Sequence, residues 1–119
     1  MSEWHRVAEH TMLKDGQMKE ITVDGIVMLV ARVEGQYYAV QARCPHMGGH
    51  LGRGTLEGSI VVCPRHGSRF DIRDGQNVEW IPELPSLVRG VAKTVRKPAD
   101  LTVYATRIRD EQLWVETKE

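Results

Sequence analysis

Residues 44–68 read CPHMGGHLGRGTLEGSIVVCPRHGS. This stretch holds both cysteines of the chain, and a histidine lies two or three positions after each of them. Sixteen residues separate Cys44-Pro45-His46 from Cys63-Pro64-Arg65-His66, and a glycine-rich segment follows each group. A thiolate and an imidazole from each of two loops are the donors of a mixed-ligand metal site. The sequence therefore makes Cys44, His46, Cys63 and His66 the candidate metal ligands.

Short apolar segments flank this stretch on both sides. The expected strands are rich in β-branched and aromatic residues and lie at 18–23, 26–33, 36–42, 55–57, 59–62, 101–108 and 113–116. Asp24-Gly25 and Glu34-Gly35 separate the first three of them, and two-residue turns of this kind join antiparallel strands. Short strands at this spacing predict an all-β fold, either an antiparallel sandwich or a barrel.

Two segments interrupt the β pattern. Residues 12–17 could hold one helical turn, and residues 86–97 place apolar side chains at helical spacing between Pro85 and Pro98. We therefore expect a short helical insertion near 86–97. This segment carries four basic residues and no acidic one. A basic face that attracts an acidic partner and an ordinary solvated face are both open interpretations of that charge.

Length and composition indicate a globular protein. The chain has 119 residues, and its hydrophobic fraction of 41% is ordinary for one domain. Sixteen basic and sixteen acidic residues cancel, so the overall charge favours neither nucleic acid nor membrane as a partner. The longest apolar run, 26–31, is too short to cross a bilayer, and residues 1–5 lack the pattern of a secretory signal. We expect a cytoplasmic protein.

Zinc and a two-iron cluster are the two candidate occupants of the metal site. Two cysteines and two histidines can bind zinc tetrahedrally. Zinc fingers, however, usually take both cysteines from one loop and both histidines from another. Here each loop offers cysteine first and histidine second. That order suits a two-iron cluster with both cysteines on one iron and both histidines on the other.

The pattern Cys-x-His, sixteen residues, Cys-x-x-His resembles that of the Rieske family, and the resemblance covers nearly the whole chain. It implies a Rieske-type antiparallel β-sandwich. It also implies a single Rieske domain over residues 1–119, with a cluster-binding subdomain at about 42–85. One 2Fe–2S cluster would be held with both cysteines on the inner iron and both histidines on the outer, solvent-facing iron.

Further positions match the family pattern or depart from it. Ser68 and Phe70 lie in the family's Gly-Ser-x-aromatic run, and residues 79–85 occupy the place of its proline loop. We expect Ser68 to donate its hydroxyl to a cluster sulfur and Phe70 to pack in the core. Gly49 and Arg65 stand where Rieske proteins of cytochrome bc complexes carry an extra, disulfide-bonded cysteine pair. This departure is typical of soluble ferredoxin-type members.

The resemblance implies an electron carrier and not an enzyme, because protein side chains supply every ligand and leave no position for a substrate. The chain is most similar to the soluble ferredoxins of ring-hydroxylating dioxygenase systems, which pass electrons from a flavin-dependent reductase to an oxygenase. The alternative within the family is the Rieske-type small subunit of an assimilatory nitrite reductase. The alternative of another class is a zinc-binding protein-interaction module. We expect a monomer whose partners are redox proteins.

The remaining histidines and loop arginines have simpler expected roles. His50 is expected to be a solvent-exposed loop residue because the ligand set is already complete, and His5 and His10 are expected at the surface. Residues 43–70 have a net charge of +3, from four arginines and one glutamate. That charge could mark a docking face or belong to solvated loop arginines.

Overall fold

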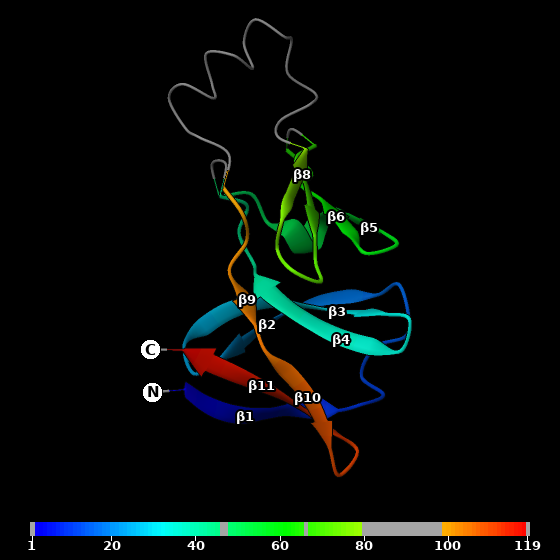
Figure 1. The fold of residues 1–119 in the computed structure, drawn as a ribbon, viewed down its shortest axis with the longest axis vertical. Coiled ribbons are helices and arrows are strands. Elements are labelled where there is room, and N and C mark those ends of the chain that lie inside the picture. The colour runs from blue at the N-terminus through cyan, green and yellow to red at the C-terminus, as the bar shows by residue number, and fades with distance from the viewer. Residues whose placement is uncertain (1, 46–47, 66, 80–98, 119) are drawn as a thin grey trace, which may run out of the picture.

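The computed structural model describes residues 2–45, 48–65, 67–79 and 99–118. Over these residues the chain forms β-strands and one short 3-10 helix, and the strands make three antiparallel sheets (Figure 1). The all-β class predicted from the sequence is thus confirmed. Within the described ranges, no helix is long and apolar enough to cross a membrane.

The first sheet forms the lower layer of Figure 1 and has the strand order β1-β11-β10. Its strands are β1 (Ser2–Glu9), β10 (Thr106–Arg109) and β11 (Gln112–Lys118). β1 pairs antiparallel with β11, and the register shifts once, between Arg6 and Ala8. The sequence predicted β11 and a single strand at 101–108, of which only the second part overlaps β10. It did not predict β1, because β1 carries mostly polar side chains.

The middle sheet has the order β2-β3-β4-β9. Its strands are β2 (Met18–Val23), β3 (Ile26–Val33), β4 (Gln36–Gln41) and β9 (Val103–Tyr104). At the two hairpin turns, Asp24 and Gly25 have φ angles of 51° and 79°, and Glu34 and Gly35 have 49° and 80°. Two successive left-handed residues form the type I′ turn, whose twist matches that of the paired strands. Both predicted hairpins are therefore confirmed.

The third sheet lies on the opposite side of the middle sheet from the first one (Figure 1). Its order is β5-β6-β7-β8. The strands are β5 (Thr55–Glu57), β6 (Ile60–Val62), β7 (Arg69–Asp71) and β8 (Asn77–Glu79), and η1 (Leu51–Arg53) precedes them. After β7, the Arg73 guanidinium donates to both carboxylate oxygens of Asp71, at 3.1 and 2.8 Å. These bonds lower the pKa of Asp71 and fix the start of the β7–β8 connection.

β3 is the centre of the core because both of its faces are buried. Leu29 and Ala31 pack in a cluster with the third sheet and both cysteines, whereas Met28 and Val30 pack in a second cluster with β11. A strand covered on both faces has a continuous apolar sequence instead of an alternating one. The middle sheet therefore anchors the third sheet, and the cysteines with it, on one face.

The two segments predicted to be helical have different outcomes. Residues 12–17 form turns, so the predicted helical turn is wrong. Two N–H groups of this segment donate to neighbouring strands: that of Leu13 to the Tyr37 hydroxyl at 3.1 Å, and that of Gly16 to the Arg32 carbonyl at 2.7 Å. The helical insertion predicted near 86–97 lies outside the described residues.

Candidate metal centre

The first cysteine loop, from Cys44 to Gly49, follows β4. The Cys44 N–H donates to the Gly49 carbonyl at 2.8 Å, and the Gly48 N–H donates back to the Cys44 carbonyl at 3.0 Å. A β-bridge between Arg43 and His50 closes the base of the loop. Gly48 has a φ of 70°, a left-handed conformation that favours glycine. The loop is thus closed by its own backbone.

The second cysteine loop, from Cys63 to Ser68, repeats this arrangement. Cys63 follows β6; its N–H donates to the Ser68 carbonyl at 2.9 Å, and the Gly67 N–H donates to the Cys63 carbonyl at 3.1 Å. Gly67 has a φ of 77°. In both loops, a glycine four residues after the cysteine donates back to it. The repeated sequence Cys-Pro-x-x-Gly is the local signal for this arrangement, and the cysteine–histidine spacing alone does not indicate it.

The two loops lie against each other at Gly49. A Cβ atom built on Gly49 would lie 3.0 Å from Cγ and Cδ of Arg65 and 3.1 Å from Sγ of Cys63. Any larger side chain at position 49 would therefore crowd the second loop. Glycine at this position allows the two loops to lie against each other. The same contact brings Gly49 beside Arg65, the two positions at which the resemblance places the additional cysteine pair of Rieske proteins of cytochrome bc complexes.

Both cysteines are buried at the base of these loops. Cys44 is 1% exposed and Cys63 is 2% exposed, and they share one core cluster. Two buried cysteines in one core cluster are soft sulfur donors of the kind that an iron–sulfur centre requires. His46 and His66 lie outside the described residues. The complete ligand set therefore stays a prediction.

Ser68 and Phe70 are buried directly after the second loop. Phe70 is fully buried in the core cluster that contains both cysteines, so its predicted packing role is confirmed. Ser68 is 1% exposed, and its carbonyl closes the loop. Its role as a donor to a cluster sulfur stays a prediction. Of the expected proline loop, Glu79 ends β8, and residues 80–85 lie outside the described ranges.

The three other histidines are partly buried, more than the sequence predicted. His50 Nδ1 lies 3.2 Å from a carboxylate oxygen of Glu20. His5 Nε2 lies 3.2 Å from the Thr117 hydroxyl, across the β1–β11 pair, and His10 contacts the turn before β11. These contacts join residues far apart in the sequence, so no local pattern indicates them.

Two facing cysteine loops on an antiparallel three-sheet fold define a small β-sandwich protein with a candidate metal centre. The model of the Rieske [2Fe-2S] domain matches residues 3–104. The chain belongs to this family, and the predicted Rieske-type fold is confirmed. A Rieske domain implies a 2Fe–2S cluster.

Known relatives and solved structures agree with this assignment. The ferredoxin component of the naphthalene 1,2-dioxygenase system from Pseudomonas putida is 31% identical over 74 residues, covering 62% of this chain and 71% of that protein. The ferredoxin of carbazole 1,9a-dioxygenase from Nocardioides aromaticivorans IC177 has a TM-score of 0.76 at 25% identity, covering 94% of this chain and 95% of that one. Apoptosis-inducing factor 3 from Mus musculus is 37% identical over 75 residues, covering 63% of this chain. The match spans only 12% of that longer protein.

Gly54 lies where two backbone segments near the cysteine loops are in close contact. Substitution of this glycine tests how strongly the stability of the fold depends on that contact. Its φ is −84°, and a Cβ atom here would overlap the backbone carbonyl oxygen of Val62, the residue before Cys63. We expect Gly54→Ala to lower the free energy of unfolding by about 3 kcal/mol, because a backbone atom cannot move aside as a flexible side chain can. Chemical denaturation followed by circular dichroism measures the loss.

The matched control is Gly58→Ala, in the turn between β5 and β6. Gly58 has a φ of 63°, and an added Cβ atom would meet nothing within 4 Å. Only backbone strain opposes this change, so its expected cost is about 1 kcal/mol. Equal losses in the two variants would show that the contact between Gly54 and Val62 is unimportant.

Proposed function

We propose that this chain is a Rieske-type ferredoxin that binds one 2Fe–2S cluster through Cys44, His46, Cys63 and His66 and carries single electrons. The observation that carries the proposal is the pair of identically hydrogen-bonded cysteine loops that face each other. Each loop fixes one sulfur donor through its backbone, and a histidine follows within three residues. Membership of the Rieske family supports the cluster as the occupant.

The types of ligand explain why the protein is a carrier. When bound, the cluster supplies reversible one-electron chemistry. Two thiolates and two neutral imidazoles bring less negative charge to the irons than four thiolates do, so the protein favours uptake of an electron. Burial of Cys44 and Cys63 shields the sulfur side of the site from water, which also tunes the potential. Because side chains fill every ligand position, none is open to a substrate.

The proposed partners are a flavin-dependent reductase that supplies the electron and an oxygenase that receives it. Two of the similar proteins support this class of partner, since their names describe the ferredoxins of naphthalene and carbazole dioxygenases. A ferredoxin in such a system contacts two redox proteins in turn. The chain must therefore present the cluster end of its surface to both.

Metal analysis tests the proposed function. The purified protein should contain two irons and two inorganic sulfides per chain and should accept one electron reversibly. His66→Ala should abolish the native visible spectrum, because metal binding contributes to the folding free energy of such loops. His50→Ala is the matched control, because His50 lies at the base of the first cysteine loop but contacts Glu20. The His50→Ala variant should keep the native visible spectrum. One zinc and no sulfide in the intact protein would refute the proposal.

Ser68→Ala should lower the reduction potential. The Ser68 carbonyl accepts the Cys63 amide and the residue is buried, so its side chain is held beside the second loop. A hydroxyl that donates to a cluster sulfur stabilises the reduced state, which carries the additional negative charge. If this bond contributes ~1 kcal/mol, protein-film voltammetry should show a fall of roughly 40 mV.

Ser59→Ala is the control for this measurement. Ser59 precedes β6, whereas Cys63 follows it, so the same substitution is made at the opposite end of one strand. Its potential should equal that of the wild type. A higher potential after Ser68→Ala would contradict the assigned role of the hydroxyl.

A further inference from the structure

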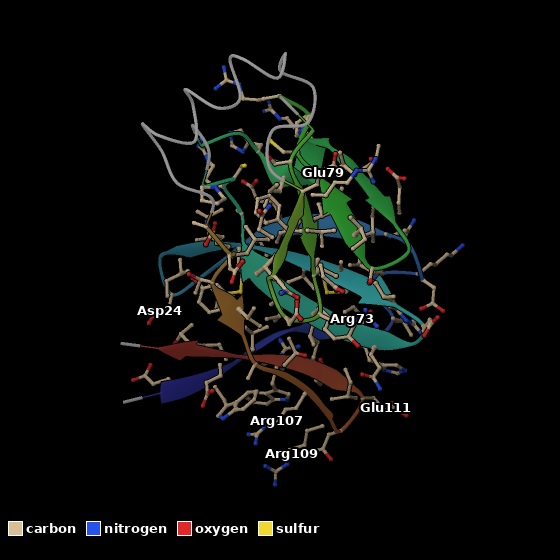
Figure 2. The ribbon with its side chains drawn as sticks, turned by 45° about the horizontal axis from the view of Figure 1, so that its top comes forward. Asp24, Arg73, Glu79, Arg107, Arg109 and Glu111 are labelled. Atoms are coloured by element: carbon tan, nitrogen blue, oxygen red, sulfur yellow. The ribbon has the colours of Figure 1, made fainter. Side chains whose placement is uncertain are left out.

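Three side chains of the types that bind metals lie together where the first sheet meets the middle sheet. They are Glu3 and His5 of β1 and Asp24 of the β2–β3 turn, and one donor atom from each lies within 4.8 Å of the other two. His5 Nε2 is 3.5 Å from a carboxylate oxygen of Glu3 and 3.9 Å from one of Asp24. Figure 2 shows Asp24 between the middle sheet and the ends of β1 and β11. This Glu3–His5–Asp24 cluster belongs to neither cysteine loop.

The two members of the cluster on β1 point toward the middle sheet. Glu3 pairs with Thr117 and His5 pairs with Val115, and directly opposed residues of paired strands lie on the same face of a sheet. Thr117 is 3% exposed and Val115 is fully buried in the core cluster that the first and middle sheets share. A sheet face that packs on the core normally carries apolar side chains. Packing of the core therefore does not account for glutamate and histidine at these two positions.

Negative charge in this cluster is not offset by a basic side chain. Among the side chains that the structure describes, no lysine or arginine forms an ion pair with Glu3 or Asp24. The Thr117 hydroxyl, 3.2 Å from His5 Nε2, is a neutral contact and does not change the charge. The side chains of Glu3 and Asp24 are 56% and 59% exposed, so an ion from solvent can reach them. A divalent cation would remove the repulsion between the two carboxylates.

The donor atoms suit a divalent transition metal. Zinc binds imidazole nitrogen and carboxylate oxygen at about 2.0–2.2 Å, and tetrahedral donors at these distances lie roughly 3.3–3.6 Å apart. The separation between His5 Nε2 and the Glu3 oxygen already falls in that range, and that between His5 Nε2 and the Asp24 oxygen is slightly longer. Magnesium and calcium prefer oxygen donors alone, whereas imidazole suits zinc. Zinc is therefore the ion that the cluster fits best.

We propose that Glu3, His5 and Asp24 form a second metal site, which binds one zinc ion and joins β1 to the β2–β3 turn. Two of the ligands are two residues apart on one strand, so they lie on the same face, and the third comes from another sheet. A water molecule would complete the four-coordinate site. The third sheet lies on the other side of the middle sheet (Figure 1), so the zinc site is independent of the proposed electron-carrier function.

Zinc titration of the cluster-containing protein tests this proposal. By isothermal titration calorimetry, the wild type should bind one zinc ion per chain at this site, and the visible spectrum of the cluster should not change. Asp24→Asn should weaken binding by about 100-fold, because even the loss of a group that only orients a ligand costs about 10- to 100-fold. Asp24 has a φ of 51°, and asparagine tolerates this left-handed conformation, so the turn should be kept.

Glu34→Gln is the matched control for Asp24→Asn. Glu34 occupies the equivalent position of the β3–β4 turn, with a φ of 49°, and lies outside the cluster. The substitution removes the same charge from the same kind of turn, so zinc affinity should equal that of the wild type. Equal weakening in the Asp24→Asn and Glu34→Gln variants would overturn the proposal.

A second pair of variants tests the imidazole ligand. His5→Ala should weaken zinc binding by about 100-fold, as Asp24→Asn does. His10→Ala is its control, because His10 Nδ1 contacts the Glu111 carbonyl at 2.9 Å and does not belong to the cluster. Zinc affinity should be unchanged in His10→Ala. If His5→Ala disturbs β1, the comparison of Asp24→Asn with Glu34→Gln still tests the site.

Zinc K-edge X-ray absorption of the loaded wild type identifies the ligands directly. The spectrum should show nitrogen and oxygen at about 2.0–2.2 Å and no sulfur at about 2.3 Å. A sulfur ligand would place the zinc at Cys44 or Cys63 and overturn the proposal. Failure of the wild type to bind zinc, or equal zinc affinity in the wild type and His5→Ala, would also overturn it.

Discussion

Each cysteine is held by the same two backbone hydrogen bonds, and the candidate metal centre depends on that repetition. The cysteine amide donates to the carbonyl five residues later, and the glycine amide four residues later donates back to the cysteine carbonyl. Both glycines are left-handed, at φ angles of 70° and 77°. These bonds are made by the protein backbone alone, and they fix the positions of both cysteines. The loops are therefore closed without a disulfide between them.

Packing of the three sheets sets how these loops meet. Cys44 follows β4 of the middle sheet and Cys63 follows β6 of the third sheet, yet both lie in one core cluster. That cluster includes Leu29 and Ala31 from one face of β3, while the other face of β3 packs with the first sheet. The position of one cysteine relative to the other is therefore a property of the whole core. Glycine at position 49 then removes the side chain that would keep the loops apart.

Much of this arrangement could be predicted from local sequence. The hairpins at Asp24-Gly25 and Glu34-Gly35 are local, because two residues determine the turn type. The spacing between each cysteine and its histidine is also a local pattern, so it identified the two loops. The strand β1 was missed because it is fixed by pairing with β11, more than one hundred residues away in the chain.

The claim that each loop supplies one imidazole to a two-iron cluster is tested most directly by electron–nuclear double resonance on the reduced protein labelled with nitrogen-15 histidine. Two distinguishable, strongly coupled histidine nitrogens are expected in the wild-type protein. The same labelling should show no strong coupling to His50, His5 or His10, since each contacts other protein groups. A reduced protein whose electron spin couples strongly to no histidine nitrogen would contradict the proposed histidine ligands.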